Sequence, residues 1–494
     1  MLHKMNAKRV IEIINILELE SNIINWKFKD LDFWPLLRLE IYMSLSFDLM
    51  HMTHNNDKFS RIKSLIEGNI KFPLKYFNDY KNNSNFEKND ILFLSDGISF
   101  TKINGKLYEK FIDPLKTEID KRCLSSLRLD PYHNYHIPRF SSSKFIQPFI
   151  DPIIIKEYLT FREESDFDKT NKSTILKIFK NLNLEKFNPV LEQAFLKAKL
   201  IYKISIYFEK KLKKVQPKIV FIVYYYGLYG MSMTLACRRL SIPTVDLQHG
   251  VQGDLHAAYG NWLNVPKDGF NLLPNYFWCW SKTESNAINQ WSHSVGNHEA
   301  ITGGNMLLEI WKSKEYDFIN DYEKIFNQLN FKGYKILVTL SPGISSSNVL
   351  SNLFQVIAET QNQYNWLIRL HPNMLSQKKN VIHDLKSYGI YNYEINQISR
   401  LPLYTILNNT DLHITHSSST VIEASMFGIQ SVIINEYGKE LYAKQIDEGY
   451  AVLRIKPHEI KSEILNISKF NKKEVNDESL SKLALDKIFE KISF

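Results

Sequence analysis

A run of hydroxyl side chains follows an apolar segment in the C-terminal third of this sequence. The segment 411–415 predicts a buried strand, and residues 420–427 predict a helix. The hydroxyls at that junction belong to Ser417, Ser418, Ser419 and Thr420. Free backbone amides at a helix start bind anions, so this turn predicts a phosphate site. Glu423, one turn into the helix, is a candidate to accept hydrogen bonds from ribose hydroxyls, and a capping box is the competing explanation.

A second polar turn follows the predicted strand 366–370. Arg369 lies near the end of that strand, and His371 and Pro372 follow directly. Proline restricts the backbone and fixes the direction in which the chain leaves the strand. His371 is therefore a candidate to donate hydrogen bonds to a diphosphate or phosphodiester, against the alternative of a capped structural histidine.

A third turn follows the predicted strand 335–340. Its small residues, which include Ser341 and Gly343, allow backbone amides to approach a phosphate, although N-capping of the next helix explains the serines equally well. The turn has neither the lysine of a Walker loop nor G-x-G-x-x-G spacing, so neither a P-loop nor a dinucleotide site is supported.

Acid–base residues gather after a predicted strand in the middle of the chain. The strand 243–247 is followed by Gln248, His249, Gly250, Asp254 and His256. His249, Asp254 and His256 are each able to take a proton from a hydroxyl group. Two histidines and a carboxylate can also hold a metal, but their spacing matches no specific signature.

Strands and helices alternate regularly from residue 219 onward. Strands over 219–223, 243–247, 276–280 and 299–302 form one unit, and a second unit begins with 335–340. This alternation predicts parallel, doubly wound sheets, hence an α/β fold of two Rossmann-like domains facing a cleft. Ligands bind at the carboxyl ends of such strands. By that rule Asp96, after the strand 91–94, and Tyr225, after 219–223, join the candidates.

The chain divides into four predicted parts. Residues 1–85 form a helical and irregular N-terminal region, 86–305 and 306–473 form two Rossmann-like domains, and 474–494 form a C-terminal helix. The last helix either closes the second domain or crosses back to the first.

Composition sets outer limits on these interpretations. The 494 residues are 44% apolar and 23% charged, with a net charge of +9. The apolar fraction excludes a mainly disordered chain. Three widely spaced cysteines indicate neither a disulfide framework nor a cysteine zinc site, and a reducing cytoplasm fits best. The uncharged run 219–237 favours strand, turn and helix over a membrane span. Four lysines near the end of a predicted helix, at 210, 211, 213 and 214, suit either its macrodipole or an anionic membrane.

The motifs of residues 215–455 together resemble GT-B glycosyltransferases. The resemblance is carried by Leu370-His371-Pro372 and by the serine run that leads into Glu423-Ala424 and Gly428. Within that group, the motifs resemble more specifically the bacterial capsule and lipopolysaccharide enzymes, including the sialyl- and Kdo-transferases. In those enzymes the H-P and serine motifs hold the phosphate of a CMP-sugar. The turn Gln248-His249-Gly250 is also typical of capsule-polysaccharide transferases.

The resemblance implies roles for the two domains and for individual residues. Residues 306–473 would bind the nucleotide sugar, and residues 86–305 would bind the acceptor. His371, Ser417, Ser418 and Ser419 would contact phosphate, and Glu423 would contact ribose. Gly304 and Asn305 match an inter-domain turn beside the donor. Gln248, Gly250, His256 and Tyr225 fall on the acceptor side. Asp254, His249 and Asp96, in that order, are the candidate bases, and Ser95-Asp96-Gly97 partly matches the family's acidic motif.

The expected function is metal-independent glycosyl transfer without a cofactor. The donor would be a nucleotide sugar, with a CMP-sugar such as CMP-Kdo or CMP-sialic acid favoured, and the acceptor a capsule or lipopolysaccharide glycan, free or lipid-linked. A nucleotide-sugar epimerase or hydrolase of the same fold and a non-catalytic glycan-assembly protein are the alternatives. Contact with the cytoplasmic face of the inner membrane is expected, and nucleic-acid binding is not, because the basic residues are dispersed.

Overall fold

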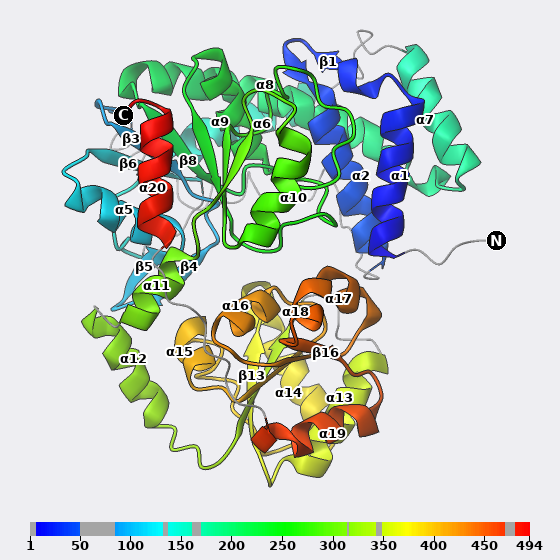
Figure 1. Cartoon of the computed structure of the whole chain (residues 1–494), viewed down its shortest axis with the longest axis vertical. Helices are drawn as coiled ribbons and strands as arrows, with labels where there is room; N and C mark the ends of the chain where they lie inside the picture. The colour runs from blue at the N-terminus through cyan, green and yellow to red at the C-terminus, as the bar shows by residue number, and fades with distance from the viewer. Residues whose placement is uncertain are drawn as a thin grey trace. The chain divides into compact units, whose positions relative to one another are not determined.

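Every strand predicted from the sequence belongs to one of two parallel β-sheets in the computed structural model of this chain (Figure 1). The structure describes residues 6–49, 84–131, 137–160, 169–313, 316–341, 348–469 and 480–494. These residues form two units. Unit 1 contains the described residues up to Leu307 together with 480–494, and unit 2 contains those from Leu308 to 469.

Unit 1 is built on a seven-stranded sheet in the order β11-β10-β9-β8-β3-β6-β7, with all neighbours parallel. Its strands are β3 (Ile91–Leu94), β6 (Ser126–Asp130), β7 (Lys144–Phe145), β8 (Ile219–Val223), β9 (Thr244–Leu247), β10 (Tyr276–Cys279) and β11 (Glu299–Thr302). Two antiparallel hairpins, β1 (Lys27–Phe28) with β2 (Leu31–Asp32) and β4 (Phe100–Ile103) with β5 (Lys106–Glu109), lie outside this sheet.

Helices cover both faces of the unit 1 sheet because alternate residues of each strand point to opposite sides. Phe93 and Phe221 pack in the core under α5 (Ile112–Lys121) and α20 (Leu480–Lys491). Leu92 and Ile222 face a larger core on the other side. The helices that contribute to that core are α1 (Ala7–Glu20), α2 (Phe33–Leu49), α6 (Gln147–Thr160), α7 (Lys169–Asn181), α8 (Pro189–Val215), α9 (Leu228–Arg239) and α10 (Lys282–Ser292).

The two ends of the chain therefore both belong to unit 1. The N-terminal helices, predicted as a separate region, share its larger core. Helix α20 lies against the sheet beside α5, so the C-terminal helix crosses back to the first domain (Figure 1). Helix α11 (Met306–Ser313) spans the division between the units, close to the predicted boundary at 305/306.

Unit 2 has a five-stranded parallel sheet in the order β13-β12-β14-β15-β16. Its strands are β12 (Lys335–Leu340), β13 (Asn365–Leu370), β14 (Leu412–Thr415), β15 (Ser431–Ile433) and β16 (Ala451–Leu453). The helices are α12 (Asp317–Asn327), α13 (Asn348–Thr360), α14 (Lys378–Ser387), α15 (Leu403–Asn408), α16 (Thr420–Met426), α17 (Glu436–Leu441), α18 (Ala443–Asp447) and α19 (Pro457–Leu465). The predicted fold class, two doubly wound α/β domains with added N-terminal helices, is confirmed.

The long uncharged run after Lys218 is a strand, a turn and a helix, as its residue order predicts. All five residues of β8 are buried, and α9 begins at Leu228. Among the residues that the structure describes, no helix combines the length and hydrophobicity needed to cross a membrane.

Some elements of unit 1 were not predicted. Strand β6 and the β4–β5 hairpin are short and mix charged with apolar residues, which hides the period of 2 that marks a strand. Residues 140–185 could not be assigned from the sequence, and they contain α6, which has a proline inside it, and α7.

His413 in β14 joins three strands of unit 2 through its ring. The Nε2 atom lies 2.8 Å from the hydroxyl of Thr339 in β12, and Nδ1 lies 2.9 Å from that of Ser431 in β15. The ring is fully buried, and burial lowers its pKa to about 3. His413 is thus a structural residue that must be neutral in the folded protein.

We expect the folded protein to lose stability in acid partly through His413. A histidine in the unfolded chain has a pKa of about 6.5, whereas burial lowers the pKa of folded His413 to about 3. Below pH 6.5 the unfolded state therefore binds a proton that the folded state does not, and stability present above pH 6.5 is lost as the pH falls. This one group should cost about 2 kcal/mol at pH 5. Urea unfolding at pH 7.5 and pH 5 should show wild type losing about 2 kcal/mol more than His413→Gln between the two pH values. Equal losses in the two proteins would contradict this assignment.

Candidate functional site

Three neighbouring strands of unit 2 deliver their polar turns to one edge of the sheet. Leu340 of β12 pairs with Leu370 of β13, and Thr339 of β12 pairs with Thr415 of β14. The amide of His371 donates to the carbonyl of Leu340 at 3.1 Å. The turns that begin at Ser341, His371 and His416 therefore start side by side. Gly343, also predicted for this site, lies outside the described residues.

His371 is exposed at this edge and its ring has a fixed direction. Pro372 begins a short 3₁₀-helix over Pro372–Gln377, and the Nδ1 atom of His371 accepts a hydrogen bond from the amide of Asn373 at 3.1 Å. Because Nδ1 is the acceptor, the proton of a neutral ring is on Nε2. His371 therefore caps the 3₁₀-helix, as the structural alternative predicts, and its role toward phosphate stays a prediction.

The serine turn is shaped by its own hydroxyls. The Ser418 hydroxyl accepts from the amide of Thr420 at 3.3 Å, while Ser419, which precedes α16, makes no capping bond with its side chain. The Tyr442 hydroxyl donates to the carbonyl of Ser417 at 2.9 Å. Ser417, Ser418 and Ser419 are all half-buried. The hydrogen bond from Tyr442 therefore fixes the backbone of the turn, and its serine side chains remain partly accessible.

Arg369 and Glu423 form the charged part of this edge. One guanidinium nitrogen of Arg369 donates to the carbonyls of Ile398 and Leu401, at 2.5 and 2.8 Å. Burial lowers the pKa of Arg369 to about 10, and the nearby carboxylate of Glu423 opposes that shift. Arg369 thus remains a cation at neutral pH, and Glu423 is placed next to it by the adjacency of β13, β12 and β14.

In unit 1, Gln248 ties the end of β9 to the end of β10. Its buried side chain accepts a hydrogen bond from the amide of Trp280 at 2.5 Å and donates to the carbonyl of Gly250 at 2.9 Å. These bonds bend the chain so that the next residue, His249, leaves the strand in a fixed direction. Gln248 and Gly250 therefore shape the turn.

Three aromatic rings surround His249. The ring centroids of Tyr224, Tyr226 and Phe111 lie 5.4, 5.7 and 6.5 Å from that of His249. Its Nε2 atom is 3.4 Å from the Tyr226 hydroxyl. Burial, with a smaller contribution from Lys110, lowers the pKa of His249, and the carboxylate of Asp96 opposes this. His249 is consequently a neutral imidazole at pH 7 and able to accept a proton.

The turn after β8 that supplies two of these rings is tightly constrained. Tyr224 has a φ of 67°, in the left-handed region that non-glycine residues seldom adopt. A β-carbon on Gly230 would lie 2.4 Å from the carbonyl oxygen of Tyr224, so only glycine fits there. The amide of Tyr225 donates to the buried carboxylate of Asp246 at 3.1 Å. Backbone strain of this kind collects at functional sites, consistent with a role for this turn.

The other residues predicted for unit 1 differ in accessibility. Asp96 is buried, and its carboxylate accepts from the amides of Ile98 and Ser99 at 2.9 and 2.8 Å. Asp254 is exposed, whereas His256 is half-buried and has a pKa lowered to about 3, first by burial and then by His249.

Tyr225 does not reach the surface. Its ring is fully buried, and its hydroxyl donates to the carbonyl of Ala258. The placement on the acceptor side therefore corresponds to a core position that supports the turn rather than one that can touch a ligand.

The N-terminal helices hold the loop that carries Asp254 and His256. Arg38 of α2 is fully buried and donates to the carbonyls of Ala257, Gly260 and Asn261 at 3.0, 2.8 and 2.8 Å. Its other nitrogen pairs with Glu18 of α1 at 2.7 Å. Glu18 in turn accepts from the amides of Leu263 and Asn264 at 2.9 and 2.7 Å. This buried pair fixes both ends of residues 257–264.

Gly304 and Asn305, predicted beside the donor, lie in unit 1 and line a pocket there. Its empty space is about 270 Å³, open solvent included, and its walls include Lys110, Phe111, Gln248 and Trp280. The indole of Trp278 donates to the carbonyl of Gly304 at 2.9 Å. Among the described residues no group of three or more His, Cys, Asp or Glu side chains is arranged to hold a metal ion.

Several residues of these sites had no signal in the sequence. Lys110 and Phe111 follow the unpredicted hairpin, and nothing in the spacing links them to His249. Arg38 lies 219 positions before its partner Ala257. The one usable signal was Trp280, an aromatic residue at the end of the predicted strand 276–280.

Comparison with known proteins finds likeness in structure only. No protein-family model and no curated protein matches this sequence. The UDP-GlcNAc 2-epimerase from Neisseria meningitidis bound to UDP-GlcNAc is 14% identical, with a TM-score of 0.50 over 81% of this chain and 99% of that one. This chain has the GT-B fold. Two further structures are also similar. The S. aureus MnaA–UDP structure has 10% identity and a TM-score of 0.48, covering 82% of this chain and 97% of that one. The wall teichoic acid polymerase TagF has 11% identity and a TM-score of 0.43, covering 89% of this chain and 93% of that one.

The buried pair of Arg38 and Glu18 leads to a stability prediction. Arg38→Met should lower the free energy of unfolding by about 3–5 kcal/mol, because it leaves the Glu18 charge buried without its countercharge and removes a hydrogen-bond donor from three carbonyls. Arg9→Met, which breaks the surface pair with Glu12, should change it by about 1 kcal/mol or less.

Urea titration of both variants checks this difference. The double variant Arg38→Met with Glu18→Met should recover part of the loss, because no unpaired charge remains. If Arg38→Met were no more harmful than Arg9→Met, the pair would not be the clamp described.

Proposed function

We propose that this chain is a glycosyltransferase that moves a sugar from a nucleotide-sugar donor to a bacterial surface glycan, capsule or lipopolysaccharide. The observation that carries the proposal is the adjacency of β13, β12 and β14, which gathers His371, the serine turn, Arg369 and Glu423 at one edge of unit 2. An imidazole N–H, hydroxyls and a cation are donors for phosphate oxygens, and a carboxylate is an acceptor for ribose hydroxyls.

In the proposed reaction an acceptor hydroxyl attacks the anomeric carbon of the donor sugar. The bond from that carbon to the phosphate oxygen breaks, and the nucleotide leaves with the electron pair. His371 and the hydroxyls of Ser417, Ser418 and Ser419 would stabilise the charge on the leaving phosphate, as preorganised donors do in other enzymes. No metal or cofactor is part of the proposal.

Unit 1 would take up the proton of the acceptor hydroxyl. Of the three candidate bases we favour His249, because its neutral ring can accept a proton and the charge of Asp96 would stabilise the imidazolium that forms. Asp254 is exposed to solvent, and the carboxylate of Asp96 already accepts amide hydrogen bonds. The favoured order of bases thus changes to His249, Asp96 and Asp254.

The identity of the nucleotide is a separate part of the proposal. The H-P and serine motifs favour a CMP-sugar such as CMP-Kdo or CMP-sialic acid. The epimerase from Neisseria meningitidis, which shares this fold, was solved with UDP-GlcNAc. That likeness supports a second candidate function, epimerisation or hydrolysis of a nucleotide sugar, which consumes donor with no glycan acceptor.

We also propose that the acceptor is attached to the cytoplasmic face of the inner membrane. Of the four lysines near the end of α8, Lys213 pairs with Glu209 at 2.8 Å, and Lys211 lies 4.4 Å from the ring of Phe86. Lys210 and Lys214 are exposed and pair with no acidic residue that the structure describes, which leaves two cations for an anionic surface.

Two histidine variants separate donor binding from proton transfer. His371→Ala should weaken nucleotide binding about tenfold or more, because it removes a charge-assisted hydrogen bond. His249→Gln should leave nucleotide affinity unchanged and lower the turnover number about 10²–10⁴-fold. Nucleotide affinity is measured by calorimetry with CMP and UDP, and turnover by nucleotide release from CMP- and UDP-sugars with and without glycan acceptor.

Matched controls are His383→Ala in α14 and His293→Gln after α10, both exposed histidines, which should leave both quantities unchanged. Rapid donor consumption without acceptor would favour the epimerase or hydrolase. Nucleotide binding that survives His371→Ala intact would contradict the proposed donor site.

A further inference from the structure

The pocket in unit 1 has an uneven distribution of charge. We call it the Lys110 pocket; its lining consists of Lys110, Phe111, Leu247, Gln248, Trp278, Trp280, Gly304, Asn305, Met306 and Leu307. Of the described residues that line it, Lys110 is the only charged one, and none of them is an aspartate or a glutamate. Lys110 forms no ion pair with any residue that the structure describes, and its Nζ atom lies 5.6 Å from the centre of the Phe111 ring.

The apolar walls of the Lys110 pocket are rigid. The rings of Phe111 and Trp280 have centroids 6.3 Å apart and planes inclined by 31°. Trp278 forms a buried wall against Gly303, where a β-carbon would lie 2.2 Å from the indole ring. Phe111 and Lys110 are half-buried, so they form the accessible side of the pocket.

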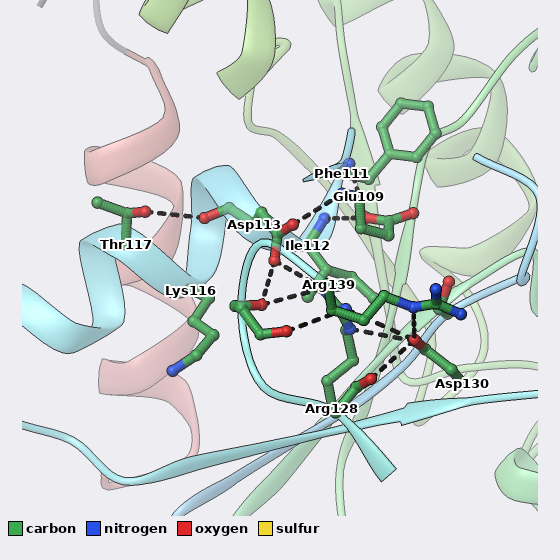
Figure 2. A network of polar contacts seen from close by, with 12 residues as sticks. Glu109, Phe111, Ile112, Asp113, Lys116, Thr117, Arg128, Asp130 and Arg139 are labelled. Atoms are coloured by element: carbon green, nitrogen blue, oxygen red, sulfur yellow. Dashed lines mark hydrogen bonds and ion pairs between the residues drawn. The ribbon is translucent and has the colours of Figure 1, made fainter. Parts of the chain in front are cut away.

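A buried polar network holds the backbone of Lys110 and Phe111 in place (Figure 2). The carboxylate of Glu109 accepts from the amides of Phe111, at 2.8 Å, and Ile112. The amide of Glu109 donates to Asp113 at 2.7 Å, and Asp113 pairs with Arg128 at 2.7 Å. The amide of Lys110 donates to the carbonyl of Ser99 at 3.0 Å. The ammonium group is therefore carried by a backbone that is fixed on both sides.

The charges around Lys110 do not neutralise it. Glu109 is fully buried, and burial, together with the charges of Asp96 and Asp113, raises its pKa well above the usual range against the opposing effect of Arg128. Burial therefore disfavours the ionised form of Glu109, and Glu109 forms no ion pair with Lys110. Asp130 and Asp113 are paired with Arg128, and Asp130 also with Arg139 at 2.8 Å (Figure 2).

We propose that the Lys110 pocket binds an anionic sugar of the acceptor, with Lys110 as the countercharge of its carboxylate or phosphate group and Phe111 and Trp280 as the apolar wall for its ring. A half-buried cation with no acidic partner among the described residues favours an anion, and aromatic side chains with few polar groups are typical of ligand pockets. That this sugar belongs to the acceptor rests on the proposed function. The pocket also places such a sugar beside His249, because Phe111 contacts that ring and Gln248 precedes it.

Binding of simple sugars to the full chain tests this proposal. Methyl β-glucuronide, glucose 1-phosphate, methyl β-glucoside and inorganic phosphate are titrated separately, with saturation-transfer NMR as the readout. We expect one or both anionic sugars to bind, the neutral glucoside to bind at least tenfold more weakly, and Lys110→Gln to remove that preference. Whichever of the two anionic sugars binds more tightly shows whether the pocket prefers a carboxylate or a phosphate group. Lys106→Gln, an exposed lysine of the same hairpin, is the matched control and should change nothing.

The outcomes separate this proposal from the proposed function. Anionic sugars that bind Lys110→Gln as well as wild type, equal binding of the neutral glucoside, or binding of inorganic phosphate alone would each overturn it, as would binding of none of the probes. Nucleotide affinity is measured on the same proteins and should be unchanged by Lys110→Gln. Loss of the sugar preference with intact nucleotide binding supports the pocket. Nucleotide binding without any sugar binding contradicts the pocket and leaves the donor site standing.

Discussion

Both sheets of this protein consist of parallel strands, and this constraint determines where chemistry can occur. The central strands β8, β12 and β14 are buried on both faces between helices, so almost every side chain within them is apolar or fully hydrogen-bonded. Along these strands, accessible polar groups therefore occur in the turns that leave the strands, and in a parallel sheet the turns at the carboxyl ends share one edge. His371 and the serine turn meet in unit 2 for this reason, and His249 and Asp96 approach one another in unit 1 for the same reason.

Turns at such an edge need supports, and unit 1 supplies them with buried charges. Arg38 and Glu18 fix the loop after β9 through backbone groups, and Arg128 and Asp113 fix the turn that carries Lys110. Each cation is desolvated and compensated by carboxylates or carbonyls. Removing one partner of such a buried pair strongly destabilises the fold. The N-terminal helices thus have a structural explanation, because they complete the core of unit 1 and hold the loop that follows β9.

Local patterns predicted the parts of this structure that depend on local signals. Ile219–Val223 and Lys335–Leu340 are short β-branched runs bounded by turns, and both are strands. The H-P turn and the serine turn lie at the same edge of the unit 2 sheet, after the two strands that flank β12. The mixed-charge strand β6, the hairpin before Lys110 and the clamp of Arg38 on residue 257 depend on contacts distant in sequence, for which periodicity gives no signal. Tyr225 shows the limit of placement alone: it follows a strand at the correct edge, yet its ring points into the core.

The central claim is that the carboxyl edge of β12, β13 and β14 in unit 2 binds the nucleotide part of a donor. Hydrogen–deuterium exchange of the full chain with and without CMP, UDP, GDP or CDP locates such binding directly. The account predicts that at least one nucleotide slows exchange in peptides that contain residues 371–374 and 416–424, and that the same peptides in His371→Ala lose most of that protection. Protection confined to unit 1, or no protection by any of the four nucleotides at saturating concentration, would contradict it.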